Sequence, residues 1–185
     1  ITLFIIEAFL TIIEKKNSIQ RSYVSKFEFI KNYKNKNTEI IFPAYHPDFN
    51  ENNNQFIPLG DISFSKIALC NESGDWSIFN SDRYGFNNYD DVWDDNHKIL
   101  LIGDSYVQGA CVNQDEIISN QIMGKTDLKV LSIANSKTGP ISQLGLLQEY
   151  IGIIKPKKLI WFYYEGNDFS DLKFEKKNLI AKDYI

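Results

Sequence analysis

Ser105 is the residue of this sequence best suited to act as a nucleophile. It is the last residue of a Gly-Asp-Ser motif, at Gly103, Asp104 and Ser105, that directly follows the apolar run at residues 98–102. A serine at the end of a buried parallel strand can project its hydroxyl group at the edge of the sheet. The N–H groups of a following helix would favour negative charge at the same place. The same residues also suit an ordinary helix N-cap, where Asp and Ser are common.

A second motif offers a hydrogen-bond donor for the same chemistry. Gly166, Asn167 and Asp168 follow the apolar run at residues 159–164. The side-chain amide of Asn167 can donate to the oxyanion of a tetrahedral intermediate, and Gly166 lets the backbone bend tightly. Gly-Asn-Asp alone is a plain turn, but its position at a matching strand end favours a site shared with Ser105.

A third loop, at residues 136–140, follows the apolar run at residues 128–133. A backbone N–H group from this loop could complete a three-donor oxyanion site with Asn167 and the Ser105 amide. The alternative is a simple strand-to-helix connection in which Pro140 occupies the first helical turn.

These motifs must be positioned by alternating strands and helices. The runs at 98–102, 128–133 and 159–164 are short and continuously apolar, as expected for strands buried on both faces. Helical spacing of apolar residues at 115–125 and 142–154 separates them. The alternation predicts an α/β domain with a parallel sheet and right-handed crossovers. Ligand sites on such sheets lie at the carboxyl ends of the strands, where all three motifs occur.

The first half of the chain is predicted to add a hairpin and a connector. Strand-like residues at 62–67 and 76–79 flank a turn at 71–74, where Asn and Gly tolerate left-handed backbone angles. We therefore place an α/β domain at residues 57–185 and a stalk, connector or loosely packed helix at residues 17–56.

The start of the chain is almost wholly apolar. Residues 1–13 are interrupted by a charged side chain only at Glu7, and this run is shorter than the ~20 residues that cross a bilayer. Two interpretations stay open: residues 1–16 are a truncated signal anchor, or they form an ordinary buried helix. The anchor is favoured because the apolar stretch touches the start of the sequence. It predicts a membrane-anchored, periplasmic or extracytoplasmic protein; otherwise the protein is cytoplasmic.

In this order the three motifs resemble the first three blocks of the SGNH (GDSL-type) hydrolases. The resemblance covers roughly residues 80–172. The segments at 81–88 and 161–168 look particularly like membrane-anchored members linked to bacterial surface polysaccharide. The resemblance implies a flavodoxin-like, three-layer α/β/α fold with a parallel sheet, incomplete at its C-terminus.

The resemblance also implies roles for individual residues. Ser105 would be the nucleophile and Asn167 an oxyanion donor, and a residue of the second block would be the other donor. An ungapped register places Lys137 at that position, with Gly139 two residues later; a positive φ would strain Lys137, so both remain alternatives. Supporting positions would be Gly103, Asp104, Gly166 and Asp168.

The fourth block of the family is missing. The family takes its base and orienting acid from an Asp-x-x-His near the C-terminus, and the two histidines of this sequence, His46 and His97, stand in no such motif. A serine without a base is a weak nucleophile. We therefore expect the chain alone to be nearly inert, or truncated, and truncation is the preferred explanation.

The functional prediction is a serine-dependent ester hydrolase or O-acyltransferase that acts on an acylated small molecule or, more specifically, an acylated glycan. The alternative is a catalytically inactive SGNH-like module that binds glycans or acts as a scaffold. Aromatic side chains of either could stack on sugar rings, although aromatic residues are more often part of a core. The aromatic candidates are Trp76, Tyr84, Trp93 and Tyr106.

Composition limits the remaining possibilities. The 185 residues have a formal net charge of −4, and the basic run of Lys31, Lys34 and Lys36 is interleaved with Asn, which favours a solvated connector over a binding patch. We therefore expect no nucleic acid partner. Cys70 and Cys111 occur without a C-x-x-C pair or a His cluster, so we expect neither a metal nor a cofactor. A disulfide between the two cysteines and a pair of buried thiols are equally compatible with the sequence.

Overall fold

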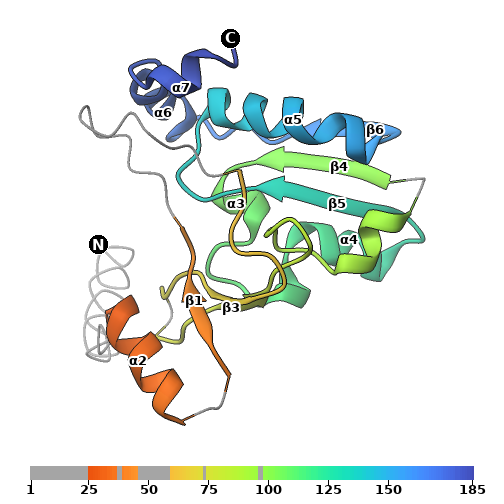
Figure 1. Cartoon of the computed structure of the whole chain (residues 1–185). Helices are drawn as coiled ribbons and strands as arrows, with labels where there is room; N and C mark the ends of the chain where they lie inside the picture. Colours follow the sequence, from red (N-terminus) through yellow and green to blue (C-terminus); the bar gives the residue numbers. More distant parts are fainter. Residues whose placement is uncertain (1–24, 37–38, 46–58, 73, 96–97) are drawn as a thin grey trace, which may run out of the picture.

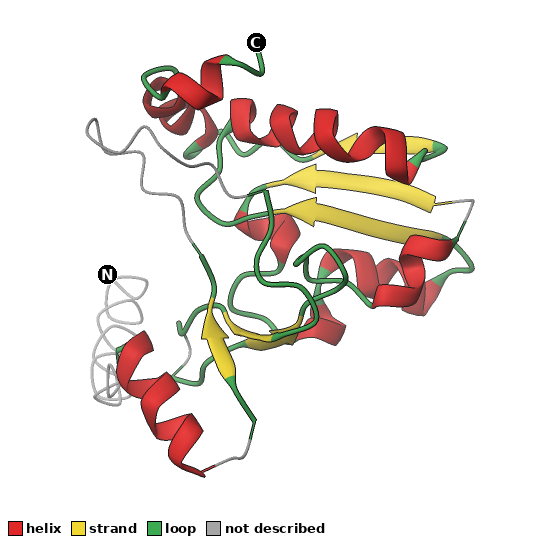
Figure 2. Ribbon diagram, viewed as in Figure 1, coloured by secondary structure: helices red, strands yellow, loops and turns green. Residues whose placement is uncertain are grey.

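The computed structural model describes residues 25–36, 39–45, 59–72, 74–95 and 98–185 (Figure 1). Within them the protein is mixed α/β, as predicted (Figure 2). The proposed anchor at residues 1–16 and both histidines, His46 and His97, lie outside the described residues. In the described part, no helix has the length and apolar character needed to cross a membrane.

The main sheet has three parallel strands, β4 (Lys98–Gly103), β5 (Lys129–Ala134) and β6 (Lys158–Trp161). Their order is β5-β4-β6, so the first strand lies between the second and the third. The chain passes from β4 to β5 and then back across β4 to β6. In such a sheet the switch point, where ligands bind, lies between the first and third strands, here β4 and β6.

Helices pack on both faces of this sheet. On one face, Leu100 and Ile102 of β4 contact a core that includes Leu146 of α5 (Pro140–Ile154). On the other face, Leu101 packs with Val107 of α3 (Ser105–Gln108) and with side chains of α4 (Ile118–Lys125). Figure 1 shows α5 and α4 on opposite sides of β4 and β5. Alternate side chains of β4 and β5 are buried on opposite faces of the sheet, which explains why these two runs are apolar throughout. The prediction that the run at 159–164 is likewise buried on both faces is wrong: every residue of β6, which lies at the edge of this sheet, is exposed.

A smaller sheet lies beside the first one and contains the predicted hairpin. β2 (Lys66–Ala68) pairs antiparallel with β3 (Ile78–Asn80), and Asn71 and Gly74 exchange hydrogen bonds in the turn between them. β1 (Ile41–Pro43) pairs parallel with β2 on its other side. Residues 41–43 belong to the segment predicted as a connector, but they form a strand of this sheet, and Ile41 is buried there. The connector also contains α2 (Lys26–Lys36), which has no buried residue.

Several predicted bounds differ from the observed ones. The helix expected at 115–125 is a 3₁₀ turn, Gln114–Glu116, followed by α4. Glu116 accepts a bond from the backbone of Asn113 in a capping box, which closes the short turn before α4 begins. The strand expected at 159–164 ends at Trp161; Phe162 still donates to the carbonyl of Ile102 of β4 at 2.8 Å, and the chain turns at residues 165–167. The remaining elements are a 3₁₀ turn at Asp90–Asp94, α6 (Asp168–Glu175) and α7 (Leu179–Lys182).

The loop at residues 81–88 joins the smaller sheet to the free edge of β5. Asn88 donates to the carbonyl of Ser132 at 2.8 Å and accepts from its N–H at 2.9 Å, as a neighbouring strand would. Asp82 is fully buried and accepts four hydrogen bonds of 2.8–2.9 Å. The donors are the N–H groups of Tyr84 and Phe86 and the side chains of Asn88 and Trp93. The buried carboxylate thus holds the loop in one conformation.

A disulfide joins Cys70, after β2, to Cys111, after α3, with Cα atoms 5.2 Å apart. Of the two alternatives left by the sequence, the structure therefore has the disulfide. Cys111 follows Ala110, whose N–H donates to the carbonyl of Ser105 at 2.8 Å. The disulfide consequently connects the smaller sheet to the turn that contains the candidate nucleophile.

Replacing Cys70 with serine should destabilise the protein by about 2–4 kcal/mol, because the disulfide closes a sequence separation of 41 residues in the unfolded chain. Urea unfolding of the variant and of the oxidised protein measures this difference. A Cys111→Ser variant is the matched control and should lose the same amount, since each change removes the same bond. A loss below about 0.5 kcal/mol in both would show that the disulfide does not constrain the chain.

Asp61 should make stability depend on pH. Loss of solvent raises the pKa of its carboxyl to about 6, against the N–H of Tyr45 at 2.7 Å and the charge of Lys26, which both lower it. Between about pH 4 and pH 6 the Asp61 carboxyl is therefore protonated in the folded state and ionised in the unfolded chain. Stability should fall by at most about 3 kcal/mol as the pH rises from 4 through 6.

The variant Asp61→Asn is neutral at every pH and should remove this dependence. We expect it to be more stable than the parent at pH 7.5 and about equal to it at pH 4, as measured by urea unfolding at both values. Asp127→Asn replaces an exposed carboxylate and should leave the difference between the two pH values unchanged. If Asp61→Asn behaves like this control, the Asp61 carboxyl does not titrate with a raised pKa.

Candidate functional site

The three predicted loops meet at the carboxyl ends of β4, β5 and β6. β5 and β6 both pair parallel with β4, so the carboxyl ends of the three strands share one edge of the sheet; Figure 1 shows β4 and β5 pointing the same way. Side-chain hydrogen bonds connect these loops. The structure thereby places the predicted residues around the switch point between β4 and β6.

Ser105 begins α3 directly after β4. The preceding residue, Asp104, is the N-cap: its carboxylate accepts from the N–H of Tyr106 at 3.0 Å. The alternative interpretation of the motif as an N-cap therefore holds for Asp104, while Ser105 is the first helical residue and is only partly buried. Gly103 is required because a Cβ atom there would lie 2.5 Å from the side chain of Val107. α3 has only four residues, so individual N–H groups matter more than a helix dipole.

Asn167 lies in the loop that follows β6, and its side chain reaches the turn that contains Ser105. Its Nδ2 atom lies 3.4 Å from a carboxylate oxygen of Asp104 and 2.9 Å from one of Asp171. Its Oδ1 atom is buried and has no partner among the described residues. The two predicted motifs are therefore in contact, although both hydrogens of the Asn167 amide face carboxylates. The bond to Asp104 is the longer and weaker of the two.

Asp168 holds the loop after β6 in place. The side chain is fully buried, and its carboxylate accepts from the N–H of Tyr164 at 2.6 Å and from the side-chain amide of Gln143 at 3.3 Å. Gln143 in turn accepts from the indole of Trp161 at 2.6 Å. Asp168 thus fixes the backbone next to Asn167.

Lys137 and Gly139, the two alternatives for the second-block donor, lie in the loop after β5. Lys137 has a φ of 61°, in the left-handed region that is unfavourable for lysine because of its Cβ atom. The N–H of Gly139 donates to the buried carboxylate of Glu175 at 2.8 Å, as do the N–H groups of Ile141 and Ser142. Glu175 therefore caps the start of α5, and the Gly139 amide is already occupied.

The loop after β5 is also hydrogen-bonded to α3, the helix that begins with Ser105. Gln108 of α3 is buried, and its side-chain oxygen accepts from the N–H of Ser136 at 2.8 Å and from the hydroxyl group of Ser136. Asn87 donates to the carbonyl of Gln108 at 2.9 Å. The segment at 81–88 thus supports α3 and, through it, the second loop. This gives the segment a structural role that its sequence alone did not reveal.

The site is acidic. Burial raises the pKa of Asp168 and of Asp171, and the charge of Asp104 acts in the same direction on both. Within the described residues, no group of acidic, His or Cys side chains has the arrangement of a metal site. No histidine is among the described residues, so the structure places no imidazole next to Ser105.

Sequence reasoning missed four residues of the site: Gln108, Gln143, Asp171 and Glu175. Asp171 lies four positions after Asn167, a spacing that brings side chains together on a helix and could have suggested the contact. Glu175 caps a helix that begins 35 residues earlier, at Pro140, and no local pattern signals such a pairing.

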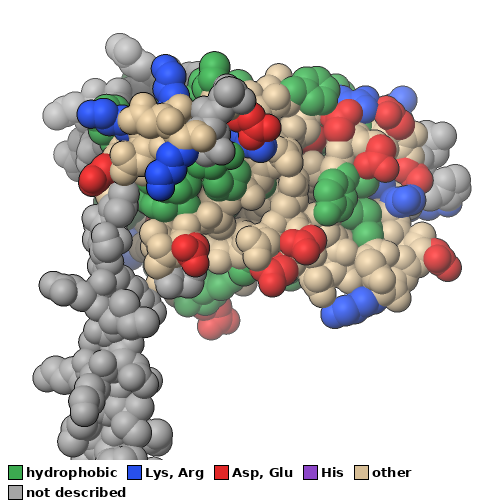
Figure 3. Space-filling model, turned by 90° about the horizontal axis from the view of Figure 1, so that it is seen from below, with side chains coloured by type: hydrophobic (Ala, Val, Ile, Leu, Met, Phe, Trp, Pro, Cys, Tyr) green, Lys and Arg blue, Asp and Glu red, His purple; other side chains and the backbone are tan. Residues whose placement is uncertain are grey.

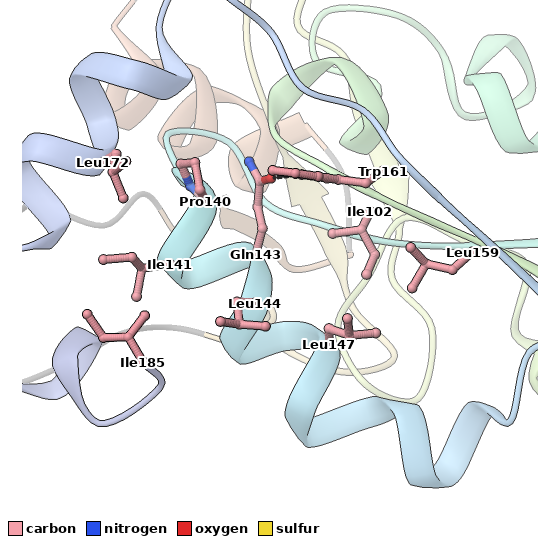
Figure 4. A pocket seen from close by; sticks show the side chains of 10 residues that line it. All are labelled: Ile102, Pro140, Ile141, Gln143, Leu144, Leu147, Leu159, Trp161, Leu172 and Ile185. Carbon is pink, nitrogen blue, oxygen red and sulfur yellow. Dashed lines mark hydrogen bonds between the residues drawn. The ribbon is translucent and has the colours of Figure 1, made fainter.

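An apolar cavity of about 360 Å³ lies beside the site, between α5, β6 and α6 (Figure 4). Gln143 is its polar member and also contacts Asp168. Ser105 does not line it. The apolar lining residues are Ile102, Pro140, Ile141, Leu144, Leu147, Leu159, Trp161, Leu172 and Ile185.

The aromatic residues proposed to stack on sugars have different environments. Trp93 is buried in the core and packs against Tyr84, with ring centroids 4.4 Å apart, so these two are core residues. Trp76 stacks on Phe29 of α2, with ring centroids 5.3 Å apart. Tyr106 is exposed next to Ser105. Figure 3 shows that apolar side chains reach the surface of one face in separate patches, with charged side chains between them.

Comparison with protein-family models, curated proteins and solved structures finds no match to this chain.

Proposed function

We propose that the protein is a serine-dependent ester hydrolase or O-acyltransferase of the SGNH type, with Ser105 as its nucleophile. The observation that supports this most strongly is the contact between two motifs that are 63 residues apart: the Asn167 amide lies 3.4 Å from Asp104, the neighbour of Ser105. A hydroxyl group and a side-chain amide at adjacent strand ends are two of the three parts that serine-dependent acyl transfer requires, the third being a general base.

In the proposed reaction the Ser105 hydroxyl oxygen attacks the ester carbonyl carbon and its proton passes to a general base. The oxyanion of the tetrahedral intermediate accepts from Asn167 and from backbone amides. The bond to the leaving alcohol then breaks, the alcohol takes the proton, and an acyl-serine remains. Water as acceptor gives hydrolysis, and a sugar hydroxyl gives acyl transfer.

The oxyanion donors follow from the contacts. Of the two hydrogens on the Asn167 amide, the one that faces Asp104 makes the weaker bond, and we assign this hydrogen to the oxyanion. The other hydrogen stays bonded to Asp171. Because the Gly139 amide donates to Glu175, we assign the second-block role to the amide of Lys137. The left-handed backbone of Lys137 is a strained conformation of the kind found at functional sites.

The general base of this mechanism is an imidazole. None of the described residues supplies one, and His46 and His97 lie outside them. We propose that the base is a histidine outside the described residues, within or beyond this sequence. The disulfide between Cys70 and Cys111 supports the proposal that the site faces an oxidising, extracytoplasmic compartment.

A second candidate function is a binding module without catalysis. It is favoured by one observation: both hydrogens of the Asn167 amide face carboxylates, an arrangement that opposes a second negative charge at the same place. In this case the site would bind an acylated glycan and leave its ester intact.

The experiment that separates the two is ester turnover with an added base. We expect hydrolysis of 4-nitrophenyl acetate by the 185-residue chain to exceed, at each imidazole concentration, the rate that imidazole gives without protein. Mass spectrometry with an acceptor oligosaccharide distinguishes transfer from hydrolysis. The Ser105→Ala variant provides the baseline. Turnover equal to this baseline at every imidazole concentration would favour the binding module.

A further inference from the structure

Two exposed tyrosines flank the candidate nucleophile. Tyr106 follows Ser105 in α3, and Tyr164 belongs to the loop that leads to Asn167. Their ring centroids are 5.0 Å apart and their planes are inclined by 61°. Although they pack against each other, Tyr106 is 58% exposed and Tyr164 46%. The pair therefore bridges the two loops of the site and keeps a large aromatic surface open to solvent.

The pair is held rigidly. The ring of Tyr164 covers Gly166 so closely that a Cβ atom at position 166 would lie 2.5 Å from it. The N–H of Tyr164 donates to Asp168 and the N–H of Tyr106 to Asp104, so both backbones are fixed by buried carboxylates. Because little freedom remains to be lost, a ligand that binds these rings does so at a low entropic cost.

The pair also carries two phenol hydroxyl groups. Interaction with the side chain of Tyr164 raises the pKa of the Tyr106 phenol. The pair thus presents aromatic faces that attract polarised C–H groups, together with hydroxyl groups that can donate and accept. A sugar ring has the complementary features, namely a face of C–H groups and a rim of hydroxyl groups.

The charge of the site selects among such ligands. Asp104, Asp168 and Asp171 surround Asn167, and their carboxylates would repel a phosphate or another anionic group. Nucleotides and free fatty acids are therefore poor matches, whereas an uncharged sugar incurs no such repulsion.

We propose that Tyr106 and Tyr164 form the binding surface for a neutral pyranose ring of the substrate, next to the ester that Ser105 attacks. This deepens the proposed function and rests on it for the reaction at Ser105. The binding step itself is independent of that reaction, because the tyrosines contact the sugar in both the catalytic and the non-catalytic case.

The test measures binding in the absence of chemistry. In a Ser105→Ala background, isothermal titration calorimetry follows the binding of O-acetylated tetrasaccharides built from glucose, galactose, mannose or N-acetylglucosamine. We expect at least one of them to bind, and Tyr106→Ala and Tyr164→Ala each to weaken that binding about tenfold. Tyr106→Phe and Tyr164→Phe keep the rings and should stay within about threefold of the parent.

Tyr163→Ala is the matched control. This tyrosine is 45% exposed and belongs to the same loop, but its ring packs against Trp161 rather than against Tyr106. Its removal should leave binding unchanged, and circular dichroism of every variant excludes unfolding as a cause. The proposal is overturned if none of the four tetrasaccharides binds, or if the alanine variants at 106 and 164 bind as well as the control.

The outcomes also separate this proposal from the proposed function. Tyrosine-dependent binding together with full ester turnover by Ser105→Ala would retain the sugar surface and remove the serine mechanism. Ser105-dependent turnover of 4-nitrophenyl acetate together with tyrosine-independent sugar binding would do the reverse.

Discussion

Ester turnover above the rate given by imidazole alone is expected to be lost when Ser105 is replaced by alanine, because the variant lacks the oxygen that forms the acyl intermediate. The remaining parts of the site stay in place: Asp104 caps α3 through its own side chain, and no hydrogen bond from the Ser105 side chain holds the described structure together. Stability should therefore change by less than about 0.5 kcal/mol. The measurement is the initial rate of acetyl ester hydrolysis with imidazole present, alongside urea unfolding.

The matched control is Ser63→Ala, which removes an exposed hydroxyl group in the loop before β2. It should retain the parent rate. If Ser105→Ala also retains that rate, turnover arises from another group and the assignment of Ser105 fails. If both variants lose activity together with stability, the loss reports on folding rather than on chemistry.

The largest effect on stability is expected at Asp82. The variant Asp82→Ala should lose about 3–5 kcal/mol, because four buried donors would lose their acceptor at once. Burial raises the pKa of Asp82, and its four hydrogen bonds only partly oppose that effect. The change would release Asn88 from the edge of β5, and with it the support of α3 by Asn87. Urea unfolding, followed by circular dichroism, measures the difference.

Asp91→Ala is a suitable comparison, since Asp91 is an exposed carboxylate in the turn that follows the same loop. We expect it to change stability by less than about 0.5 kcal/mol. Equal effects of the two variants would mean that the buried carboxylate does not organise the loop, and the role assigned to residues 81–88 would have to be abandoned.

The parts of the fold that follow from local patterns could be predicted. Continuous apolar runs indicated β4 and β5 to within one residue, and Asn71 and Gly74 indicated the hairpin turn. The alternation of strands and helices was sufficient to place Ser105 and Asn167 at the same edge of a parallel sheet. These predictions succeeded because each depends on side-chain periodicity or on turn chemistry within a few residues.

Contacts between distant residues could not be predicted in this way. Asn88 pairs with Ser132, which is 44 residues later, and Glu175 caps a helix whose first residue is Pro140. Such pairs form because a buried polar group must find a partner, but many residues in the sequence could supply one. The contact between Glu175 and the Gly139 amide is of the same kind and could not be read from the sequence.

The environment of Asn167 was also beyond the sequence. A donor amide could be recognised from the Gly-Asn-Asp motif, but its contacts with Asp104 and Asp171 depend on how the loop after β6 folds over α6. That loop is set by the buried carboxylate of Asp168 and by the Gln143 side chain from α5. The sequence therefore identified the residue, and the three-dimensional contacts determined what its two hydrogens face.

The most direct test of Ser105 as nucleophile is to locate a covalent adduct. The 185-residue chain is incubated with a fluorophosphonate in the presence of imidazole, digested, and analysed by peptide mass spectrometry. We predict one modified peptide, with the phosphonyl group on Ser105, and no modification of this peptide in Ser105→Ala. An unmodified Ser105 under conditions that label a known serine hydrolase completely, or labelling at another serine only, would contradict the proposed mechanism.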